Sequence, residues 1–304
     1  LKINTKSGFV YLVGPPNVGK STLLNQLLGQ KVSIVSRKVQ TTRFSTKGIL
    51  NIKNTENNEP DCQIIFVDTP GLFEPKKALE KHIVKNTISE LNSYEHICVL
   101  YDATSSKLKF LEFSKIIKSI NLNKNNSSLI INKIDLIEKE KLLIIVKNIQ
   151  KIFEFKNVFM VSAKKGQGCK DLVDFLQTTV PVSPFLYNKD QLTDLSERVF
   201  SSEITREKLF NYLNSELPYN LYVETIIWKE TKKSITIHQN INVSKYNHKR
   251  IIIGKNGENL KKIGISSRED LEKVFNKKVN LFLFIKIKNN WMNNIKELNH
   301  LGQN

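Results

Sequence analysis

Residues 14–21 read Gly-Pro-Pro-Asn-Val-Gly-Lys-Ser and match the pattern GxxxxGK[ST], which constrains the fold more than any other feature of the chain. This segment follows a short β-rich run, residues 9–13, and precedes a helix with apolar periodicity over residues 23–28. Glycines at both ends let the loop wrap closely, so its backbone N–H groups and the helix N-terminus can face anionic phosphates. The sequence therefore predicts a phosphate-binding loop between a strand and a helix.

Individual loop residues have separate predicted roles. Lys20 is expected to reach the β- and γ-phosphate oxygens, and the Ser21 hydroxyl is expected to ligate Mg²⁺. The loop residues expected to contact nucleotide are Gly14, Asn17, Val18, Gly19, Lys20, Ser21 and Thr22.

A second motif, Asp68-Thr69-Pro70-Gly71, follows a clear strand at residues 63–67. An acidic residue at the tip of a buried strand suits a nucleotide-bound Mg²⁺, so Asp68 is a candidate metal residue. Gly71 can offer an unhindered N–H to the γ-phosphate and move when that phosphate leaves. Thr69 and Pro70 are expected to lie at the same site.

The choice of base rests on Asn132-Lys133-Ile134-Asp135 and on Ser162-Ala163-Lys164. The Asp135 carboxylate offers two acceptors that match the imino N–H and exocyclic amine of guanine, whereas adenine would leave a buried carboxylate unpaired. The stem of Lys133 can cover the ring, and Asn132 can brace the loop. The Ala163 N–H is expected to donate to the guanine carbonyl, with Ser162 and Lys164 beside it. These four motifs in order predict a GTPase.

Strands at 9–13, 63–67, 97–101, 128–131 and 158–161 alternate with helical stretches, which predicts a mostly parallel sheet with helices on both faces. Residues 48–52 and 62–67 are expected to form an edge hairpin. We assign 1–179 to a GTPase domain of α/β class and 180–194 to a linker with few apolar residues to tie it down. Residues 195–304 are assigned to a smaller α+β domain, with a helix over 195–217 and strands over 221–228, 234–242 and 279–287.

The C-terminal domain carries Gly254-Lys255-Asn256-Gly257 between residues 250–253, expected to be a basic strand, and a lysine-bearing helix. Its glycines permit close approach of a nucleic-acid strand, and apolar side chains such as Ile253, Leu260 and Ile263 can contact unstacked bases. The residues expected to bind RNA are Lys249, Arg250, Ile253, Gly254, Lys255, Asn256, Gly257, Lys261, Lys262 and Arg268.

Charge supports a polyanionic partner. The 304-residue chain has a net charge of +18, and residues 232–304 hold 15 Lys and Arg against 5 Asp and Glu. Three widely spaced cysteines argue against a disulfide framework or a zinc site and fit a reducing cytosol. We expect neither a membrane span nor a secretory signal, because no sufficiently long apolar run and no basic, apolar leader is present.

Several segments together resemble the Era family of bacterial ribosome-assembly GTPases: 40–43 (Gln-Thr-Thr-Arg), 194–198 (Asp-Leu-Ser-Glu-Arg), 252–257 and 260–264, with Asn290-Trp291 near the end. The resemblance spans residues 8 to about 302. It implies a P-loop GTPase domain followed by a type II KH domain that binds the 3′ end of small-subunit (16S) ribosomal RNA. It also implies a role in small-subunit assembly, with GTP and GDP as substrate and product and Mg²⁺ as cofactor.

The catalytic machinery is incomplete by the usual pattern, because Leu72 stands where many switch GTPases carry a water-orienting glutamine. We hypothesise that Asn17 coordinates K⁺, which would supply part of the charge stabilisation; alternatively Asn17 only caps the loop. Thr42 is the candidate switch threonine for Mg²⁺, with Thr41 as the alternative. Arg43 is either a finger in cis or a solvated residue. Unaided turnover is expected to be slow, ~10⁻⁴ to 10⁻² s⁻¹.

We expect GTP to order the switches, reposition the C-terminal domain and expose its RNA groove, with hydrolysis weakening RNA binding. The expected partner is the small ribosomal subunit through its RNA, and no stable protein partner is inferred. Two alternatives stay open: an RNA chaperone with a weak nucleotide switch, and a regulatory GTPase recruited peripherally to the inner face of the membrane. The expected location is the cytoplasm.

Overall fold

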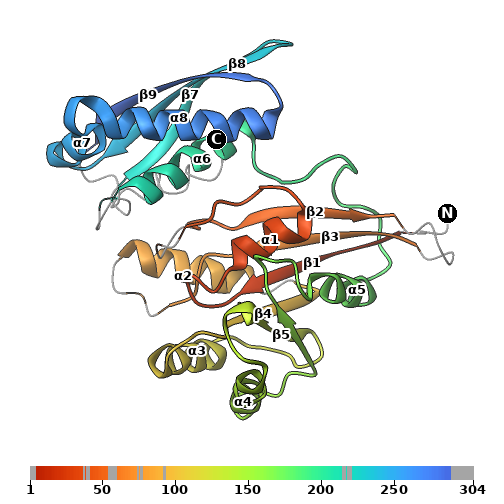
Figure 1. Cartoon of the computed structure of the whole chain (residues 1–304). Helices are drawn as coiled ribbons and strands as arrows, with labels where there is room; N and C mark the ends of the chain where they lie inside the picture. Colours follow the sequence, from red (N-terminus) through yellow and green to blue (C-terminus); the bar gives the residue numbers. More distant parts are fainter. Residues whose placement is uncertain are drawn as a thin grey trace. The chain divides into compact units, whose positions relative to one another are not determined.

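The computed structural model describes residues 5–36, 38, 42–53, 60–73, 75, 78–91, 94–213, 217 and 221–288. The chain divides into two compact units, residues 1–33 with 42–194 and residues 34–41 with 195–304 (Figure 1). Thr41, Gln40 and the Asn290-Trp291 segment, all singled out from the sequence, lie outside the residues that are described.

The first unit is built on a six-stranded sheet in the order β2-β3-β1-β4-β5-β6. Strands β1 (Thr5–Val13), β3 (Asp61–Asp68), β4 (His96–Asp102), β5 (Ser127–Asn132) and β6 (Asn157–Val161) run parallel. Strand β2 (Thr46–Ile52) pairs antiparallel with β3 at the edge. The predicted parallel sheet and its edge hairpin are therefore confirmed.

Helices cover both faces of this sheet (Figure 1). They are α1 (Lys20–Leu28), α2 (Ala78–Glu90), α3 (Lys107–Ser119), α4 (Lys139–Gln150) and α5 (Cys169–Thr179). Alternate residues of β4 enter two separate cores: Cys98 and Leu100 pack with α1 and α5, whereas Ile97 and Val99 pack with α3 and α4. Because both faces of each central strand are buried, these strands read as continuous apolar runs in the sequence.

The stretch at 180–194 is held to the first unit more firmly than its sequence suggests. The backbone oxygen of Pro181 accepts from Ser7 N at 3.1 Å, and Ile49 N donates to Leu192 O at 2.9 Å. The side-chain oxygen of buried Gln63 accepts from the backbone N–H groups of 186 and 187 at 2.9 and 3.0 Å. The expectation of a loosely held linker is wrong, because backbone and amide hydrogen bonds replace the missing apolar contacts.

The second unit pairs a three-stranded sheet, in the order β7-β8-β9, with helices on one face (Figure 1). Its elements are α6 (Glu197–Tyr212), β7 (Leu221–Glu230), β8 (Ser234–Val243), α7 (Tyr246–Ile253), α8 (Glu258–Phe275) and β9 (Lys278–Ile287). Strand β8 runs antiparallel to β7 and parallel to β9. The predicted α+β arrangement is confirmed. Within the described ranges, no helix combines the length and the apolar character that crossing a bilayer requires.

The basic segment before the GxxG turn was expected to be a strand, and this is wrong. Residues 250–253 form the last turn of α7, in which Ile252 is fully buried and Ile251 is half exposed. Gly254 ends the helix: its φ of 72° is accessible to glycine, and its N–H donates to Arg250 O at 3.0 Å. The β-branched run favours a strand locally, but the glycine that follows it provides a helix C-terminus.

Candidate nucleotide site and RNA-binding surface

The nucleotide motifs meet at one edge of the first sheet. The phosphate loop follows β1, Asp68 ends β3, Asn132 ends β5 and Ser162 follows β6. These four strands are parallel, so their carboxyl ends share the edge where open α/β sheets bind ligands. Motifs that are far apart in the sequence therefore come together at one site.

The phosphate loop is shaped by backbone that few residues other than glycine adopt. Gly14 and Gly19 have φ of 155° and 97°, and a Cβ on Gly19 would lie 2.3 Å from the side chain of Asn132. Lys20 is buried, and its Nζ donates to Gly14 O and Pro15 O at 3.1 and 3.0 Å. Burial lowers the pKa of Lys20 to about 8, against the effect of nearby Asp68. Within the described ranges the Lys20 ammonium makes no ion pair, and a phosphate at this position would supply an anionic partner.

Hydroxyl groups surround the carboxylate of Asp68. Its Oδ2 accepts from Ser21 Oγ at 2.5 Å and from Ser33 Oγ at 2.8 Å, and Thr42 Oγ1 lies 3.2 Å from Ser21 Oγ. Among the residues described, the buried Oδ1 of Asp68 has no hydrogen-bond partner. Burial raises the pKa of Asp68, and the neighbouring ammonium and hydroxyls act in the opposite direction. An all-oxygen donor set with one unsatisfied carboxylate oxygen fits Mg²⁺.

The base-binding residues are braced by one another. Asn132 Nδ2 donates to Val18 O at 2.8 Å, and Asn132 Oδ1 accepts from the N–H groups of Lys133 and Ala163 at 2.8 and 3.0 Å. The Ala163 N–H that was expected to face guanine is thus engaged with Asn132. The hydroxyl of Ser162 donates to Asp135 Oδ1 at 2.7 Å.

Asp135 remains ionised and oriented. The hydrogen bond from Ser162 is the main cause that lowers the pKa of Asp135, and the Lys165 ammonium lies 3.7 Å from Oδ2. A charged carboxylate fixed through one oxygen can present its acceptors to a donor pair on the base.

The residues after Asp68 are packed against the phosphate loop. Leu72 is 3% exposed within the core, and its N–H donates to Gly14 O at 3.0 Å. A Cβ on Gly71 would lie 2.8 Å from Pro16 Cα, so glycine is needed for this close approach. The side chain of Leu72 has no polar atom that could orient water, and its backbone N–H is already bonded to Gly14 O.

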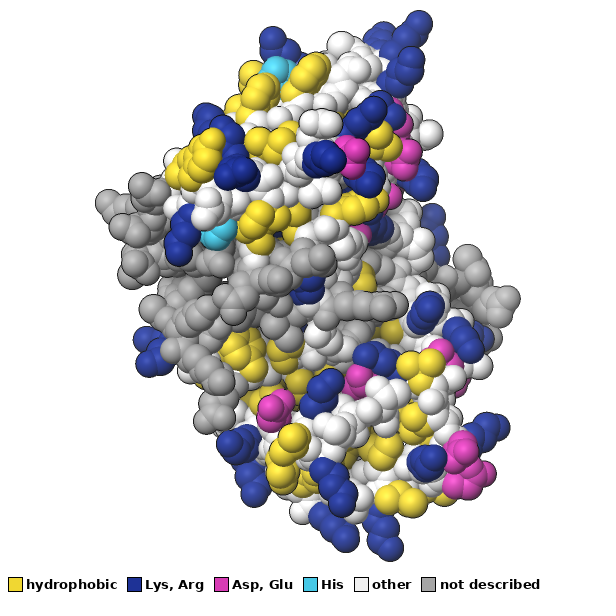
Figure 2. Space-filling model, turned by 60° about the vertical axis from the view of Figure 1, so that its left-hand side comes forward, with side chains coloured by type: hydrophobic (Ala, Val, Ile, Leu, Met, Phe, Trp, Pro, Cys, Tyr) yellow, Lys and Arg dark blue, Asp and Glu magenta, His cyan; other side chains and the backbone are white. Residues whose placement is uncertain are grey.

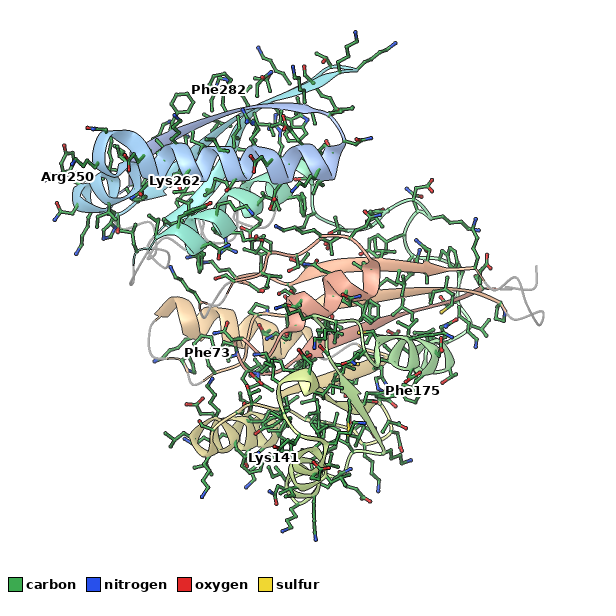
Figure 3. All side chains as sticks on the ribbon, in the orientation of Figure 1. Phe73, Lys141, Phe175, Arg250, Lys262 and Phe282 are labelled. Atoms are coloured by element: carbon green, nitrogen blue, oxygen red, sulfur yellow. The ribbon has the colours of Figure 1, made fainter. Side chains whose placement is uncertain are left out.

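The proposed RNA-binding residues gather at the end of α7 and on α8. Lys255 and Asn256 are exposed, and Asn256 has a φ of 52° in the turn. Arg250 and Lys262, labelled on α7 and α8 in Figure 3, are exposed. Lys261 and Arg268, also exposed, are seven residues apart and so share one face of α8. The remaining members, partly buried, are Lys249, Ile253, Gly254 and Gly257.

The sequence analysis placed one apolar residue wrongly on the RNA-binding surface, and it missed functional residues at both candidate sites. Ile263 is fully buried in the core of the second unit and cannot contact a base. Asn259 Nδ2 donates to Ile251 O at 3.1 Å and so closes the end of α7. Ser33 and Asp102 of the nucleotide site were also missed: Ser33 belongs to no motif, and the role of Asp102 appears only in its contacts.

Asp102, at the end of β4, fixes the lysine of the base-binding motif. Lys133 Nζ donates to Asp102 Oδ2 at 2.6 Å and to Asn17 O at 2.9 Å. The other carboxylate oxygen accepts from the backbone N–H and the hydroxyl of Thr104 at 2.9 and 2.7 Å. Lys133 itself has a φ of 65°, a left-handed conformation that these contacts hold.

The fold and site define a P-loop GTPase domain joined to a KH domain. Residues 9–133 match the family model of the 50S ribosome-binding GTPase, and residues 216–292 match that of the KH domain. A GTPase Era from Bradyrhizobium diazoefficiens is 43% identical over 288 residues, covering 94% of this chain and 91% of the relative. The chain belongs to the Era GTPase family, as the sequence motifs indicated.

Two solved structures resemble the whole chain. A crystal structure of an Aquifex aeolicus Era variant bound to GDP·AlF4⁻ is 35% identical, with a TM-score of 0.88 over 98% of this chain and 99% of that one. A structure of Era in complex with MgGDPNP and nucleotides 1506–1542 of 16S ribosomal RNA is 36% identical, with a TM-score of 0.87 and the same coverage.

Proposed function

We propose that this chain binds and hydrolyses GTP in the cytoplasm and binds small-subunit ribosomal RNA near its 3′ end, acting in small-subunit assembly. The observation that carries the GTPase part is the convergence of the phosphate loop, the Asp68 carboxylate and the Asp135–Ser162 pair at one sheet edge. The RNA part is supported by the basic KH unit and by the relative that binds nucleotides 1506–1542 of 16S ribosomal RNA.

Within this proposal the phosphate loop holds the triphosphate, with Gly14, Val18, Gly19 and Thr22 around it and Lys20 at the β- and γ-phosphates. Mg²⁺ would be held by Ser21, Thr42 and Asp68, where it supplies neutralisation of phosphate charge. Gly71 contributes its N–H to the γ-phosphate, with Thr69 and Pro70 beside it. Asp135 selects guanine and the stem of Lys133 covers the ring, while Asn132, Ser162, Ala163 and Lys164 form and brace the base pocket.

Guanine selection is tested with nucleotides that differ by one group. Inosine triphosphate lacks the exocyclic amine that Asp135 is expected to accept from, so it should bind roughly tenfold more weakly than GTP. Asp135→Asn should reverse the preference toward xanthosine triphosphate, because an amide donor matches its carbonyl. Asp174→Asn, on the exposed face of α5, is the matched control. Equal affinity of the wild-type chain for all three nucleotides would refute guanine selection.

Leu72 cannot supply a catalytic polar group, and we propose that K⁺ at Asn17 provides part of the charge stabilisation during hydrolysis. Asn17 lies in the phosphate loop with a φ of 63°, and its backbone oxygen accepts from Lys133 Nζ. Hydrolysis should be faster in K⁺ than in Na⁺ buffer of equal ionic strength, and Asn17→Ala should remove the difference. Equal rates in the two buffers would contradict this role.

RNA binding is tested by its dependence on charge. Lys255→Glu, Lys261→Ala and Lys262→Ala should each weaken binding of a 16S ribosomal RNA 3′-end oligonucleotide, and the alanine variants should reduce the salt slope by about 0.7 each. Lys141→Ala, an exposed lysine of α4, is the control. Nucleotide coupling predicts tighter RNA binding with a GTP analogue than with GDP. The same affinity in both states would refute the coupling.

A further inference from the structure

The side of β9 that points away from the helices carries two exposed phenylalanines. Along β9, Val279, Leu281, Leu283 and Ile285 pack into the helix-covered cores. Because side chains alternate along a strand, the even-numbered residues share the opposite face. There Phe282 is 48% and Phe284 is 45% exposed. The continuous apolar sequence of β9 is typical of a strand buried on both faces, but in the structure one face of β9 is exposed.

Aromatic rings contact one another on this open face. His238 of β8 pairs in register with Phe282 of β9, and Figure 3 shows Phe282 extending outward from the sheet. The His238 ring centroid lies 4.7 Å from that of Phe282 and 5.8 Å from that of Phe284, both tilted. We refer to His238, Phe282 and Phe284 as the aromatic strip. Scattered exposed apolar residues are ordinary, but three rings in contact on a sheet form a surface for flat ligands.

Lysines flank the aromatic strip on the same face. Lys278 and Lys286 occupy the same alternation of β9 as the two phenylalanines, one toward each end of the strand. On β7, Lys229 pairs with Thr236, two positions from His238 on the same side of β8. In Figure 2 hydrophobic and histidine side chains lie together among lysine and arginine on this unit. The acidic Glu224 farther along the face accepts from the amides of Asn240 and Asn242.

We propose that this outer sheet face is a second RNA-contact surface, on which unpaired bases stack against the aromatic strip while Lys278 and Lys286 contact phosphates. Stacking needs only the flat face that every base has, and the lysines supply charge complementary to the strand. A second copy of the chain docking symmetrically would bring these lysines against each other, which disfavours self-association. The proposal rests on the proposed RNA function but uses a different surface from the GxxG turn.

The test uses the full chain and RNA of 16S nucleotides 1506–1542, each carrying 2-aminopurine at one unpaired position. Stacking on a ring quenches this fluorophore. Phe282→Ser combined with Phe284→Ser should weaken RNA binding at least tenfold and abolish the quenching at one or more positions. Lys278→Gln with Lys286→Gln should lower the salt slope by about 1.4. Val274→Ser, an exposed apolar residue of α8 in the same unit, is the matched control and should change neither.

The outcomes separate this proposal from the proposed function. If Lys255→Glu weakens RNA binding while the double serine variant binds and quenches as the wild type does, the second surface is refuted and the GxxG surface stands. If the wild-type chain binds this RNA no better than an unrelated basic protein, the proposed function itself fails. A double serine variant that changes only the molar mass in light scattering shows self-association and overturns the proposal. GTP binding reports on folding of the first unit, and the far-ultraviolet circular dichroism of each variant reports on the second.

Discussion

The ion pair between Asp102 and Lys133 should set how long nucleotide stays bound. Asp102→Asn is the informative change, because the amide oxygen can keep the two contacts from Thr104 while the amide nitrogen, a donor, faces another donor. The substitution therefore removes the bond to Lys133 and leaves the end of β4 in place. Asp102 and Lys133 side chains are 9% and 32% exposed, so solvent compensates the loss only in part.

The expected loss of nucleotide affinity follows from the entropy cost of ordering the Lys133 side chain when nucleotide binds. In the wild-type protein Lys133 is ordered before nucleotide arrives, and ordering a free lysine side chain costs up to about 2 kcal/mol. The remaining bond to Asn17 O preserves part of that order. We therefore expect a loss of about 1.4 kcal/mol, which corresponds to tenfold weaker GDP binding.

Stopped-flow displacement of a fluorescent GDP analogue measures this effect, and the change should lie mostly in the dissociation rate. Thr104→Val removes a contact to the other carboxylate oxygen and should leave the affinity within twofold. In a Lys133→Ala background, Asp102→Asn should have no further effect, since the pair is already lost. Independent, additive losses from the two substitutions would refute the reasoning.

Three further predictions concern other parts of the first unit. Burial lowers the pKa of His96 to about 4 from an ordinary value of 6.5. Neutral His96 therefore stabilises the folded state above pH 6.5, and this contribution of about 3 kcal/mol to the free energy of unfolding is lost as the pH falls to 4. The variant His96→Gln should flatten that part of the pH profile of unfolding. Gly71→Ala should slow GTP hydrolysis roughly 100-fold while GDP affinity changes little, because its Cβ would displace Pro16 near the γ-phosphate position. Ser33→Ala should lower the free energy of unfolding by about 1.5 kcal/mol in thermal or urea melts, because it removes a hydrogen bond to the Asp68 carboxylate; an unchanged melt would contradict that contribution.

The placement of the nucleotide motifs at one sheet edge follows from the sequence, because each motif is a local pattern. Each motif follows a strand directly, so parallel pairing brings Lys20, Asp68 and Asp135 to the same edge without any further information. Ser33 could not be found this way, because it lies in a turn and belongs to no pattern, and only the fold brings its hydroxyl to Asp68. The sequence indicated Gln63 only as a strand residue, whereas in the structure its amide oxygen accepts hydrogen bonds from the backbone of the segment after α5.

Periodicity gave less reliable predictions in the second unit. The isoleucines before Gly254 favour a strand by propensity, and the decisive signal was the glycine that ends a helix there. Ile263 was expected to contact unstacked bases as an apolar residue of the helix after the GxxG turn, among the basic Lys261 and Lys262, yet it lies on the side of α8 that faces the core. A helix of period 3.6 places adjacent residues about 100° apart, so a basic neighbourhood in sequence says little about which side chain is exposed.

The two buried charges of the candidate nucleotide site, Lys20 and Asp68, favour a ligand that brings a cation and an anion together. Burial acts on both: it lowers the pKa of Lys20 to about 8 and raises the pKa of Asp68. Each group partly stabilises the other. Lys20 Nζ donates to loop carbonyls and Asp68 accepts from hydroxyls, so among the residues that the structure describes neither has a counter-charge in hydrogen-bond contact. An anion at Lys20 alone, or a cation at Asp68 alone, would relieve only one of these costs. A phosphate bound together with Mg²⁺ relieves both, which predicts that GTP and Mg²⁺ each tighten the binding of the other.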